Sequence, residues 1–278
     1  MKFTSQHFTA NARQALDDPT LQSALHRAKG GFVEKRSKAV AGLPEFEEIR
    51  RDAVAIKDHT LAHLDRYLEQ FERQVTASGG KVHWAETPAD LARIVTEIAQ
   101  STGGRKVIKG KSMIGEEAEV NQALHEGGFE VIETDLGEYI IQLADEPPSH
   151  IIAPAIHKTR QQVADLFKRS HTQFTIPGQR ETIAELVTEA RMVLRSHFIS
   201  ADVGITGGNF LVAENGSVVL VTNEGNGDLS STLPKVHIVT SSIEKVVPTL
   251  EDASTMLRLL GRSASGQEMS VYTTLFTG

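Results

Sequence analysis

Two lysines and a serine follow a short apolar strand that the sequence predicts at residues 106–110, "KVIKG". Ser112 has the residue type and position of an N-cap for the helix that follows it. Ligands of open α/β sheets bind beyond the carboxyl ends of the strands, and the free N–H groups of a helix start attract anions. Lys109, Lys111 and Ser112 could therefore hold a carboxylate or a phosphate. The alternative is an ordinary N-cap beside two solvated lysines.

Three carboxylates crowd the end of the next predicted strand, "FEVIE". They are Glu133, Asp135 and Glu138. Clustered carboxylates can raise one another's pKa, and their oxygens can bind a divalent cation. The same residue types are also typical of a capped, solvated loop, so the pattern allows both interpretations.

Histidines offer a third kind of chemistry. His157 stands with Lys158 at a predicted helix start directly after "IIAPA", so His157 is a candidate catalytic residue that could face the same crevice. His150 and His237 are weaker candidates, since a single histidine is more often simply hydrogen-bonded. No histidine spacing resembles a metal-ligand motif and the chain has no cysteine, so we expect no metal site.

A hairpin is predicted where "NFLVA" and "SVVLVT" flank Asn215 and Gly216, because a type I′ turn needs positive φ at both central residues. Polar and glycine-rich rims, "GITGGN" and "TNEGN", bracket these apolar strands. The polar residues on or beside the strands are Asn209, Glu214, Asn215, Asn223, Glu224 and Asn226. Buried asparagines need hydrogen-bond partners, and glycines let the backbone approach a ligand closely.

Turn geometry accounts for Asn215 and Gly216 but leaves the two rims unexplained. We expect a ligand site there, with Asn209, Asn223, Glu224 and Asn226 binding the ligand and Glu224 also a catalytic candidate. The antiparallel return of the hairpin would bring Asn209, Asn223 and Glu224 to one end of the sheet. Glu214 would then lie at the opposite, turn end.

Strands that alternate with helices must position these residues. Besides the strands above, the pattern predicts strands at "KVHWAE", "SHIIAPA", "KVHIVT" and "EMSVYTTLF". It also predicts helices near 88–102, 112–124, 158–169, 179–198 and 249–261. Alternation implies parallel pairing through right-handed crossovers, and the late hairpin adds antiparallel pairing. The predicted fold is an open mixed α/β sheet with helices on both faces.

The first 79 residues have a different, helical character. Apolar positions recur at spacings of three and four from Leu43 to Val75, which predicts one long amphipathic helix that "SGG" at 78–80 ends. The preceding "LQSALHRAKGGFVEKRSKAVA" is helical as well. We therefore divide the chain into an N-terminal helical arm, 1–79, and an α/β domain, 80–278. The arm could pack on the body, on a partner or on a second copy of the chain.

Composition narrows the classes of partner. The 278 residues carry a formal net charge of −7, which argues against nucleic acid and anionic membranes. No apolar run approaches the roughly 20 residues that span a bilayer, and the first residues lack the apolar core of a secretion signal. We expect a cytoplasmic protein without membrane insertion. Without cysteine, these residues can hold no cysteine-ligated iron–sulfur cluster.

Long segments of the sequence resemble a known family. They are "GEEAEVNQAL", "ETDLGEYIIQLADEPPSHIIAPAIHK", "ADVGITGGNFLVAENGSVVLVTNEGN", "LPKVHIVTSSIEKVVPTLEDA" and "YTTLFTG". Together they are similar to the LUD domain of the lactate utilization protein B (LutB) family, an iron–sulfur component of the LutABC system for L-lactate oxidation. The likeness covers residues 10 to 278.

The resemblance implies a fold like that of the NagB/RpiA/CoA-transferase superfamily. It also implies LutA- and LutC-like partner subunits and a role in electron transport from lactate. In full-length relatives the chain continues past a "TG" like Thr277-Gly278 into a ferredoxin-like region whose cysteines bind [4Fe–4S] clusters. This sequence stops there, as a shortened or a natural short form, so we expect no cofactor within this chain.

Three functional hypotheses follow. In the first, the domain supports oxidation of L-lactate to pyruvate: Lys109, Lys111 and Ser112 receive a carboxylate, and the remainder of the ligand bonds to the residues Asn209, Asn223, Glu224 and His157. In the second, the chain is a non-catalytic assembly module. In the third, "ENG" at 214–216, which is similar to the glutamate motif of CoA-transferases, makes Glu214 a nucleophile toward an acyl thioester. The glycine-rich oxyanion segment expected of that family is absent.

Overall fold

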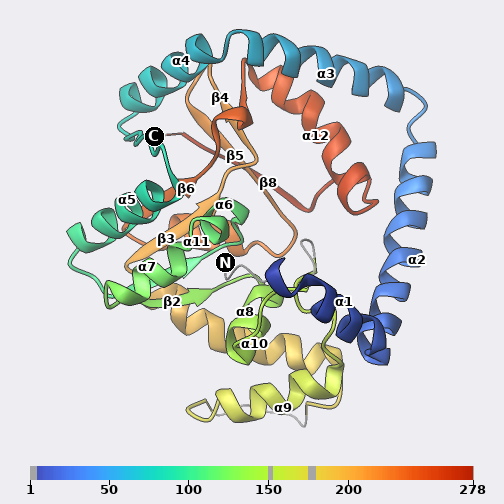
Figure 1. The fold of residues 1–278 in the computed structure, drawn as a ribbon. Coiled ribbons are helices and arrows are strands. Elements are labelled where there is room, and N and C mark those ends of the chain that lie inside the picture. Colours follow the sequence, from blue (N-terminus) through green and yellow to red (C-terminus); the bar gives the residue numbers. More distant parts are fainter. Residues whose placement is uncertain (1–4, 150–152, 175–179, 278) are drawn as a thin grey trace.

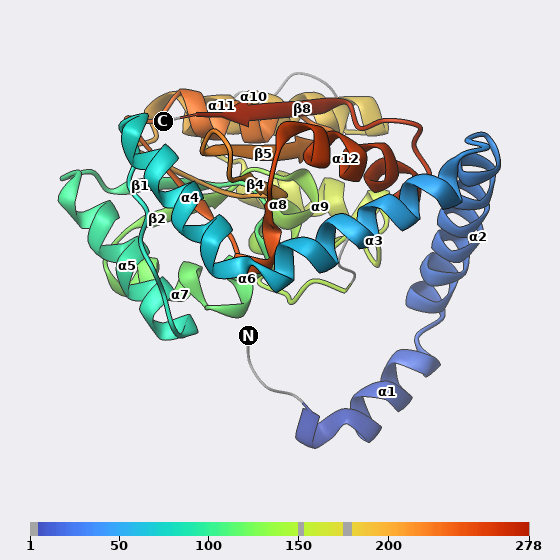
Figure 2. The ribbon, with the colours of Figure 1, turned by 90° about the horizontal axis from the view of Figure 1, so that it is seen from above.

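The computed structural model describes residues 5–149, 153–174 and 180–277. Two β-sheets form the body, and four N-terminal helices curve around it as an arm (Figures 1 and 2). The predicted α/β class is confirmed, and the architecture is compatible with a NagB/RpiA-like fold. Across the described ranges, no helix combines the length and apolar character needed to cross a bilayer.

Sheet A is wholly parallel and has the strand order β2-β1-β3-β6. Its strands are β1 (Lys106–Lys109), β2 (Glu130–Glu133), β3 (Val203–Gly207) and β6 (Val236–Thr240). Lys109 pairs in register with Glu133 on one side and with Ile205 on the other. Parallel strands end at the same edge, so the last residues of these strands lie together at the carboxyl edge of sheet A.

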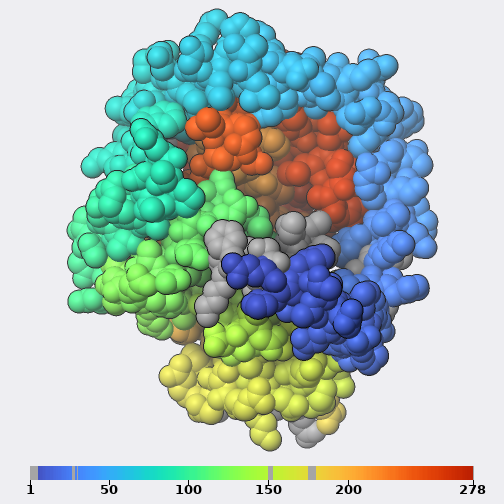
Figure 3. All heavy atoms as spheres, in the orientation of Figure 1, coloured from blue at the N-terminus to red at the C-terminus, as the bar shows by residue number. Residues whose placement is uncertain are grey.

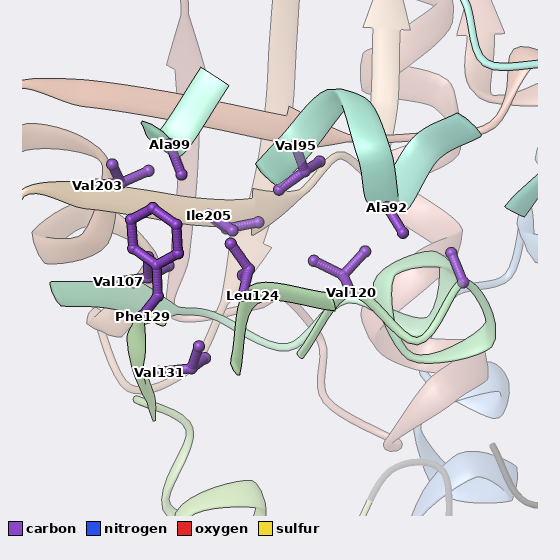
Figure 4. Close-up of a cluster of buried hydrophobic side chains, with 11 residues drawn as sticks. Ala92, Val95, Ala99, Val107, Val120, Leu124, Phe129, Val131, Val203 and Ile205 are labelled. Atoms are coloured by element: carbon purple, nitrogen blue, oxygen red, sulfur yellow. The ribbon is translucent and has the colours of Figure 1, made fainter. Parts of the chain in front are cut away.

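One face of sheet A is covered by α5 (Pro88–Ser101) and α7 (Val120–Glu126), with the short α6 (Met113–Glu117) between β1 and α7. Figure 4 shows apolar side chains of α5 and α7 meeting those of β1, β2 and β3. The Thr87 hydroxyl and the Asp90 carboxylate form a capping box at the start of α5. This packing fixes the α6–α7 segment over the carboxyl edge.

The other face is covered by α8 (Leu136–Ala144), α9 (Arg160–Ser170), α10 (Ile183–Ser200) and α11 (Asn226–Thr232). Gly204 allows α11 to approach β3, because a Cβ at this position would lie 1.7 Å from the carbonyl oxygen of Ser230. The helices predicted at 158–169 and 179–198 correspond to α9 and α10. The prediction of helices on both faces of the sheet is therefore confirmed.

The predicted hairpin belongs to sheet B, a separate mixed sheet of order β7-β4-β5-β8. Its strands are β4 (Phe210–Val212), β5 (Ser217–Thr222), β7 (Val246–Val247) and β8 (Tyr272–Phe276), and a 3₁₀ turn, Ile243–Lys245, precedes β7. The predicted type I′ turn is wrong: Gly216 has φ +72°, but Asn215 does not have positive φ. Four residues separate β4 from β5, and the Asn215 side chain accepts a hydrogen bond from Ser217 N instead.

The arm comprises a 3₁₀ turn (Ser5–His7), α1 (Phe8–Asp17), α2 (Pro19–Ala41), α3 (Phe46–Ala62) and α4 (Leu64–Ala77). The single long helix predicted from Leu43 to Val75 is wrong, because the chain bends at His63 (φ −131°, ψ 34°). The bend lets α3 pack on α12 (Leu250–Ala264) while α4 places Phe71 in the core of sheet B. The arm thus packs on the body, and the boundary at residue 79 stays a prediction.

One predicted strand does not form, and another lies partly outside the described residues. Residues 81–86, "KVHWAE", have no strand partner and connect α4 to the start of α5. In "SHIIAPA", residues 150–152 lie outside the described residues and 154–157 form turns. The alternation in "KVHWAE" could not show that sheet A already has its edge strands without this segment.

Candidate functional site

A buried ion pair lies at the carboxyl edge of sheet A. Lys109 ends β1 and Glu133 ends β2, and Lys109 Nζ is 2.6 Å from Glu133 Oε1. Lys109 is 0% and Glu133 is 4% exposed. Burial lowers the pKa of Lys109, but attraction to Glu133 and then to Glu116 and Glu138 outweighs it, so the pKa is raised. Lys109 is therefore a buried cation. The sequence predicted it as a ligand for an anion from solvent, but its ammonium group is not accessible to solvent.

The amide of Asn121, at the start of α7, completes this ion pair. Asn121 Nδ2 donates to Glu133 Oε1 at 2.7 Å, while the backbone N–H of Glu133 donates to Gln142 at 3.0 Å. Burying an ion pair is costly unless further hydrogen bonds satisfy the charged groups. Asn121 is a site residue that sequence reasoning missed, because nothing in its local pattern shows that α7 returns over β2.

Lys111 and Glu138 form a second, less buried pair at the same edge. Lys111 Nζ lies 3.3 Å from Glu138 Oε1, and the two side chains are 23% and 8% exposed. Burial raises the pKa of Glu138, Lys111 lowers it and Glu133 raises it again, with a net increase. Lys111 is thus the more accessible cation of the pair of lysines predicted to bind a carboxylate.

Glu116, on α6, is the third carboxylate of the edge and was also missed from the sequence. Burial, followed by the negative charge of Glu138, raises its pKa to about 7, despite the opposing effect of Lys109. A carboxyl group with this pKa can exchange a proton near neutral pH. The spacing of residues in the sequence did not identify Glu116 as a site residue. Glu116 follows "KSMIG" on a short helix, and the orientation of this helix depends on β1 and β6.

The edge leaves several acceptor atoms without partners. Glu116 Oε1, Asn121 Oδ1 and Glu133 Oε2 are three of the five buried side-chain polar atoms of the described residues that lack a hydrogen bond. A fourth is Asn226 Oδ1, whose amide nitrogen lies 3.3 Å from Thr134 Oγ1. Since most buried polar groups are satisfied, such a concentration marks this edge as a candidate binding site.

Ser112 has a structural part in the edge. Its hydroxyl caps the backbone N–H of Gly115, as predicted, and lies 2.7 Å from Thr240 Oγ1 at the end of β6. The helix it begins, α6, has only five residues. Because such a helix has a weak dipole, the two lysines carry most of the positive charge that an anion would meet.

The polar rims of the hairpin are divided between the two sheets. Asn209 accepts a hydrogen bond from Val221 N at 2.8 Å, and Asn223 accepts one from Val271 N at 3.3 Å, so both carboxamides stabilise sheet B. Desolvation of its carboxyl group and then the charge of Asp135 raise the pKa of Glu224, while Lys111 lowers it. Glu224 and Asn226 therefore belong to the sheet A edge, whereas the described contacts of Asn209 and Asn223 do not.

The remaining candidates have contacts elsewhere. His157 lies between Ser149 Oγ at 2.7 Å and Glu146 Oε2 at 2.9 Å, and Glu146 also pairs with Lys158. His237 bonds to Thr206 at 2.8 Å, and burial lowers its pKa to about 4, so it is neutral. His150 lies outside the described residues.

Glu214 lies at the turn end of the hairpin, as predicted from the strand order. Its carboxylate accepts a hydrogen bond of 2.6 Å from Leu250 N at the start of α12. The residue is exposed, and this contact gives it a capping role in the fold.

Figure 3 shows this face of the molecule hollowed, with orange and red atoms beneath the arm and green atoms at the lower margin of the hollow. Within the described ranges, no group of three histidine, aspartate or glutamate side chains could hold a metal ion. The edge therefore consists of two lysines surrounded by carboxylates and amides. Among these residues, Lys111 and Glu116 are partly exposed.

Comparison with known proteins agrees with the predicted resemblance. The sequence profile of the LUD domain matches residues 68–278. The chain is 42% identical over its full length to the uncharacterized electron transport protein YkgF of Escherichia coli and covers 58% of that protein. It is also 42% identical to lactate utilization protein B of Bacillus subtilis, and 43% identical to that of Shouchella clausii.

These two relatives are likewise matched by the whole of this chain, which covers 57% and 58% of their lengths. The chain thus spans well under two thirds of the curated relatives that it matches. No solved structure matches the chain. Because the profile match extends over most of the chain, the chain belongs to the LUD domain family.

Proposed function

We propose that this chain supports the oxidation of L-lactate to pyruvate as the LUD-domain part of a lactate utilization protein. The observation that carries the proposal is the 42% identity, along the entire chain, to relatives named for lactate utilization. Electron transfer would then belong to [4Fe–4S] clusters held by residues other than those of this cysteine-free chain. The contribution of the LUD domain would be to bind and position a small carboxylate.

Lys111 is the residue best placed to bind that carboxylate. It is partly exposed, lies at the carboxyl edge of sheet A and already pairs with the carboxylate of Glu138. A ligand carboxylate could take the place of Glu138, and the raised pKa of Glu138 would allow it to accept a proton when that pairing is lost. Lys109 would add a fixed positive charge from behind.

Calorimetric titration of the intact chain with L-lactate and pyruvate tests this proposal. We expect binding at millimolar ligand, weakened about tenfold or more by Lys111→Met because charge-assisted hydrogen bonds contribute about 1.5–3 kcal/mol. Lys245→Met, at an exposed ion pair away from the edge, is the control. Absence of heat with both ligands, or equal weakening by the control, would contradict carboxylate binding at Lys111.

A second candidate function is assembly, which the arm favours. Helix α1 has no buried residue, and its Phe8 and Leu16 side chains are 71% and 70% exposed. These residues could dock LutA- or LutC-like subunits. Deleting residues 1–79 would also remove Phe71 from the core of sheet B, so Phe8→Gln with Leu16→Gln is the sharper test. Co-purification with such subunits should be lost in this variant, and retention would contradict a docking role for α1.

A further inference from the structure

Two histidines lie one helical turn apart at the joint between α3 and α4. His59 is in the last turn of α3, and His63 is the residue at which the chain bends into α4. Both are exposed, and their ring centroids are 4.5 Å apart with an angle of 36° between the ring planes. The expectation that no histidine spacing resembles a metal-ligand motif is wrong at this pair, because histidines at i and i+4 can bind one metal ion from the same face of a helix.

His63 already makes the hydrogen bond that is typical of a metal ligand. Its Nδ1 lies 2.8 Å from the carbonyl oxygen of His59, which can only accept, so Nδ1 carries the proton and donates it. In a neutral imidazole with this tautomer, Nε2 has a lone pair. Metal-binding histidines almost always donate their other ring N–H to a carbonyl, a carboxylate or water. The His63 ring is therefore in the tautomer that can bind a metal ion through Nε2.

Tyr67 supplies a third polar atom next to the two histidines. It follows His63 by four residues in α4, and its hydroxyl oxygen lies 2.9 Å from His59 Nε2. A tetrahedral zinc ion with bonds of about 2.0–2.1 Å holds two ligand atoms about 3.3 Å apart, so this contact would need to open by only about 0.4 Å. The exposed ring of His59 can turn by this amount.

We propose that His59, His63 and Tyr67 form a binding site for a divalent transition-metal ion of the zinc type. Imidazole nitrogens suit such ions, whereas Mg²⁺ and Ca²⁺ are bound by oxygen atoms. Water would complete a tetrahedral set of four ligands. Because one of the three side chains is a phenol, this site differs from the groups of three histidine, aspartate or glutamate side chains that the described residues lack.

A metal ion at this site would hold the bend between α3 and α4. The two helices meet at the top of the molecule in Figure 1 and pack on different parts of the body: α3 lies on α12, and α4 places Phe71 in the core of sheet B. His59 and Tyr67 lie on opposite sides of the bend, so an ion bound to both fixes the angle between the helices. An ion that binds the folded chain better than the unfolded chain also stabilises the fold.

Calorimetric titration of the chain, without an affinity tag, with ZnCl₂ tests the site. We expect one zinc ion per chain to bind in the micromolar range, and no heat of binding with MgCl₂. His59→Gln and His63→Gln should each weaken zinc binding about tenfold or more. Tyr67→Phe should weaken it by a smaller factor, because water can replace the phenol oxygen. This variant keeps the ring over which the Arg66 guanidinium lies.

His26→Gln is the matched control. His26 is an exposed histidine of α2, another helix of the arm, and no histidine lies four residues from it. The control should keep the wild-type affinity for zinc. Saturating zinc should raise the Tm of the wild-type chain by about 5 °C and that of the His59→Gln/His63→Gln variant by about 1 °C or less. Circular dichroism without zinc should show that the variants are folded, since both histidines are exposed.

The contrary outcomes are distinct. Absence of zinc binding would overturn the site, and so would equal weakening by His26→Gln, which would show adventitious binding only. Wild-type affinity in Tyr67→Phe would overturn Tyr67 as a ligand. An unchanged Tm with zinc bound would overturn stabilisation of the bend. None of these measurements involves lactate or Lys111, so failure of this inference is distinguishable from failure of the proposed function.

Discussion

The carboxyl edge of sheet A and the hairpin of sheet B contain similar residue types with different environments. In the hairpin, Asn209 and Asn223 accept backbone hydrogen bonds, and Glu214 accepts one from the start of α12. At the edge, Glu133 is buried in an ion pair with Lys109 and still has an oxygen without a partner.

The difference teaches how to separate a structural polar residue from a functional candidate. A polar side chain whose hydrogen bonds are complete contributes to stability and has little left to offer a ligand. Buried charges with unsatisfied atoms cost stability and can recognise a ligand when it arrives. The comparison predicts that substitutions at the edge change binding and pH dependence, whereas those in the hairpin change stability alone.

The largest expected effect is that of Lys109→Met. Removing the cation leaves Glu133 buried without its ion pair, which should lower the free energy of unfolding by about 3–5 kcal/mol. Chemical denaturation measures this value. The Lys109→Met/Glu133→Leu double variant should recover most of the loss, because no buried charge is left unpaired. A loss below about 1 kcal/mol in the single variant would contradict the buried ion pair.

Gly216→Ala probes the hairpin and should have the next largest effect. Gly216 has φ +72°, and a Cβ there would lie 2.6 Å from Val75 N of α4. Strain and the clash together should lower the free energy of unfolding by about 2–4 kcal/mol without changing lactate affinity. Gly103 has φ +70° with open space, so Gly103→Ala is the control for backbone strain alone. Equal losses in the two variants would contradict close packing of the hairpin on α4.

Glu116→Gln probes the pH dependence of the edge. The pKa of Glu116 is raised from 4.5 to about 7, so the folded state binds more protons and loses stability as pH rises from about 4.5 to 7. The variant removes this loss. Allowing for solvent screening, it should be about 1–2 kcal/mol more stable than wild type at pH 8 and similar to it at pH 4. Thermal unfolding across this pH range measures the difference in the free energy of unfolding. If this free energy changed with pH in the same way for both proteins, a raised pKa of Glu116 would be contradicted.

The smallest expected effect is that of Glu214→Ala. It removes the hydrogen bond from Leu250 N, but Thr249 still caps α12 with its capping box, so the loss should be about 0.5–1 kcal/mol. Calorimetry should show unchanged affinity for L-lactate. A marked loss of affinity would show that the hairpin turn, and not the sheet A edge alone, takes part in binding.

Local sequence signals predicted many elements correctly. The strand at 106–110 and the Ser112 cap follow from residue type and spacing, and both are observed. The predictions were wrong where the structure of a segment depends on the element that packs against it. "KVHWAE" alternates like a strand but has no neighbour to pair with, and the bend at His63 lets α3 and α4 pack on different elements.

The candidate site was predicted in part for the same reason. Lys109, Lys111 and Asn226 lie at the edge of sheet A, because the carboxyl ends of strands can be read from the chain. Glu116 and Asn121 could not be assigned, since their approach to Glu133 depends on the path of α6 and α7. Asn209 and Asn223 were predicted as ligand-binding residues, yet Asn209 accepts a hydrogen bond from Val221 N of β5, and Asn223 accepts hydrogen bonds from Val271 N and the Gln267 side chain.

By itself, the sequence determined the α/β class, the family, the absence of cysteine and the lysines at a strand end, because these depend on residue type and local periodicity. Only the tertiary structure decided which carboxylates surround those lysines, which of them are buried and which acceptors have no donor. Burial and charge pairing join Lys109, Asn121 and Glu133 from separate elements, and no local pattern records such distances.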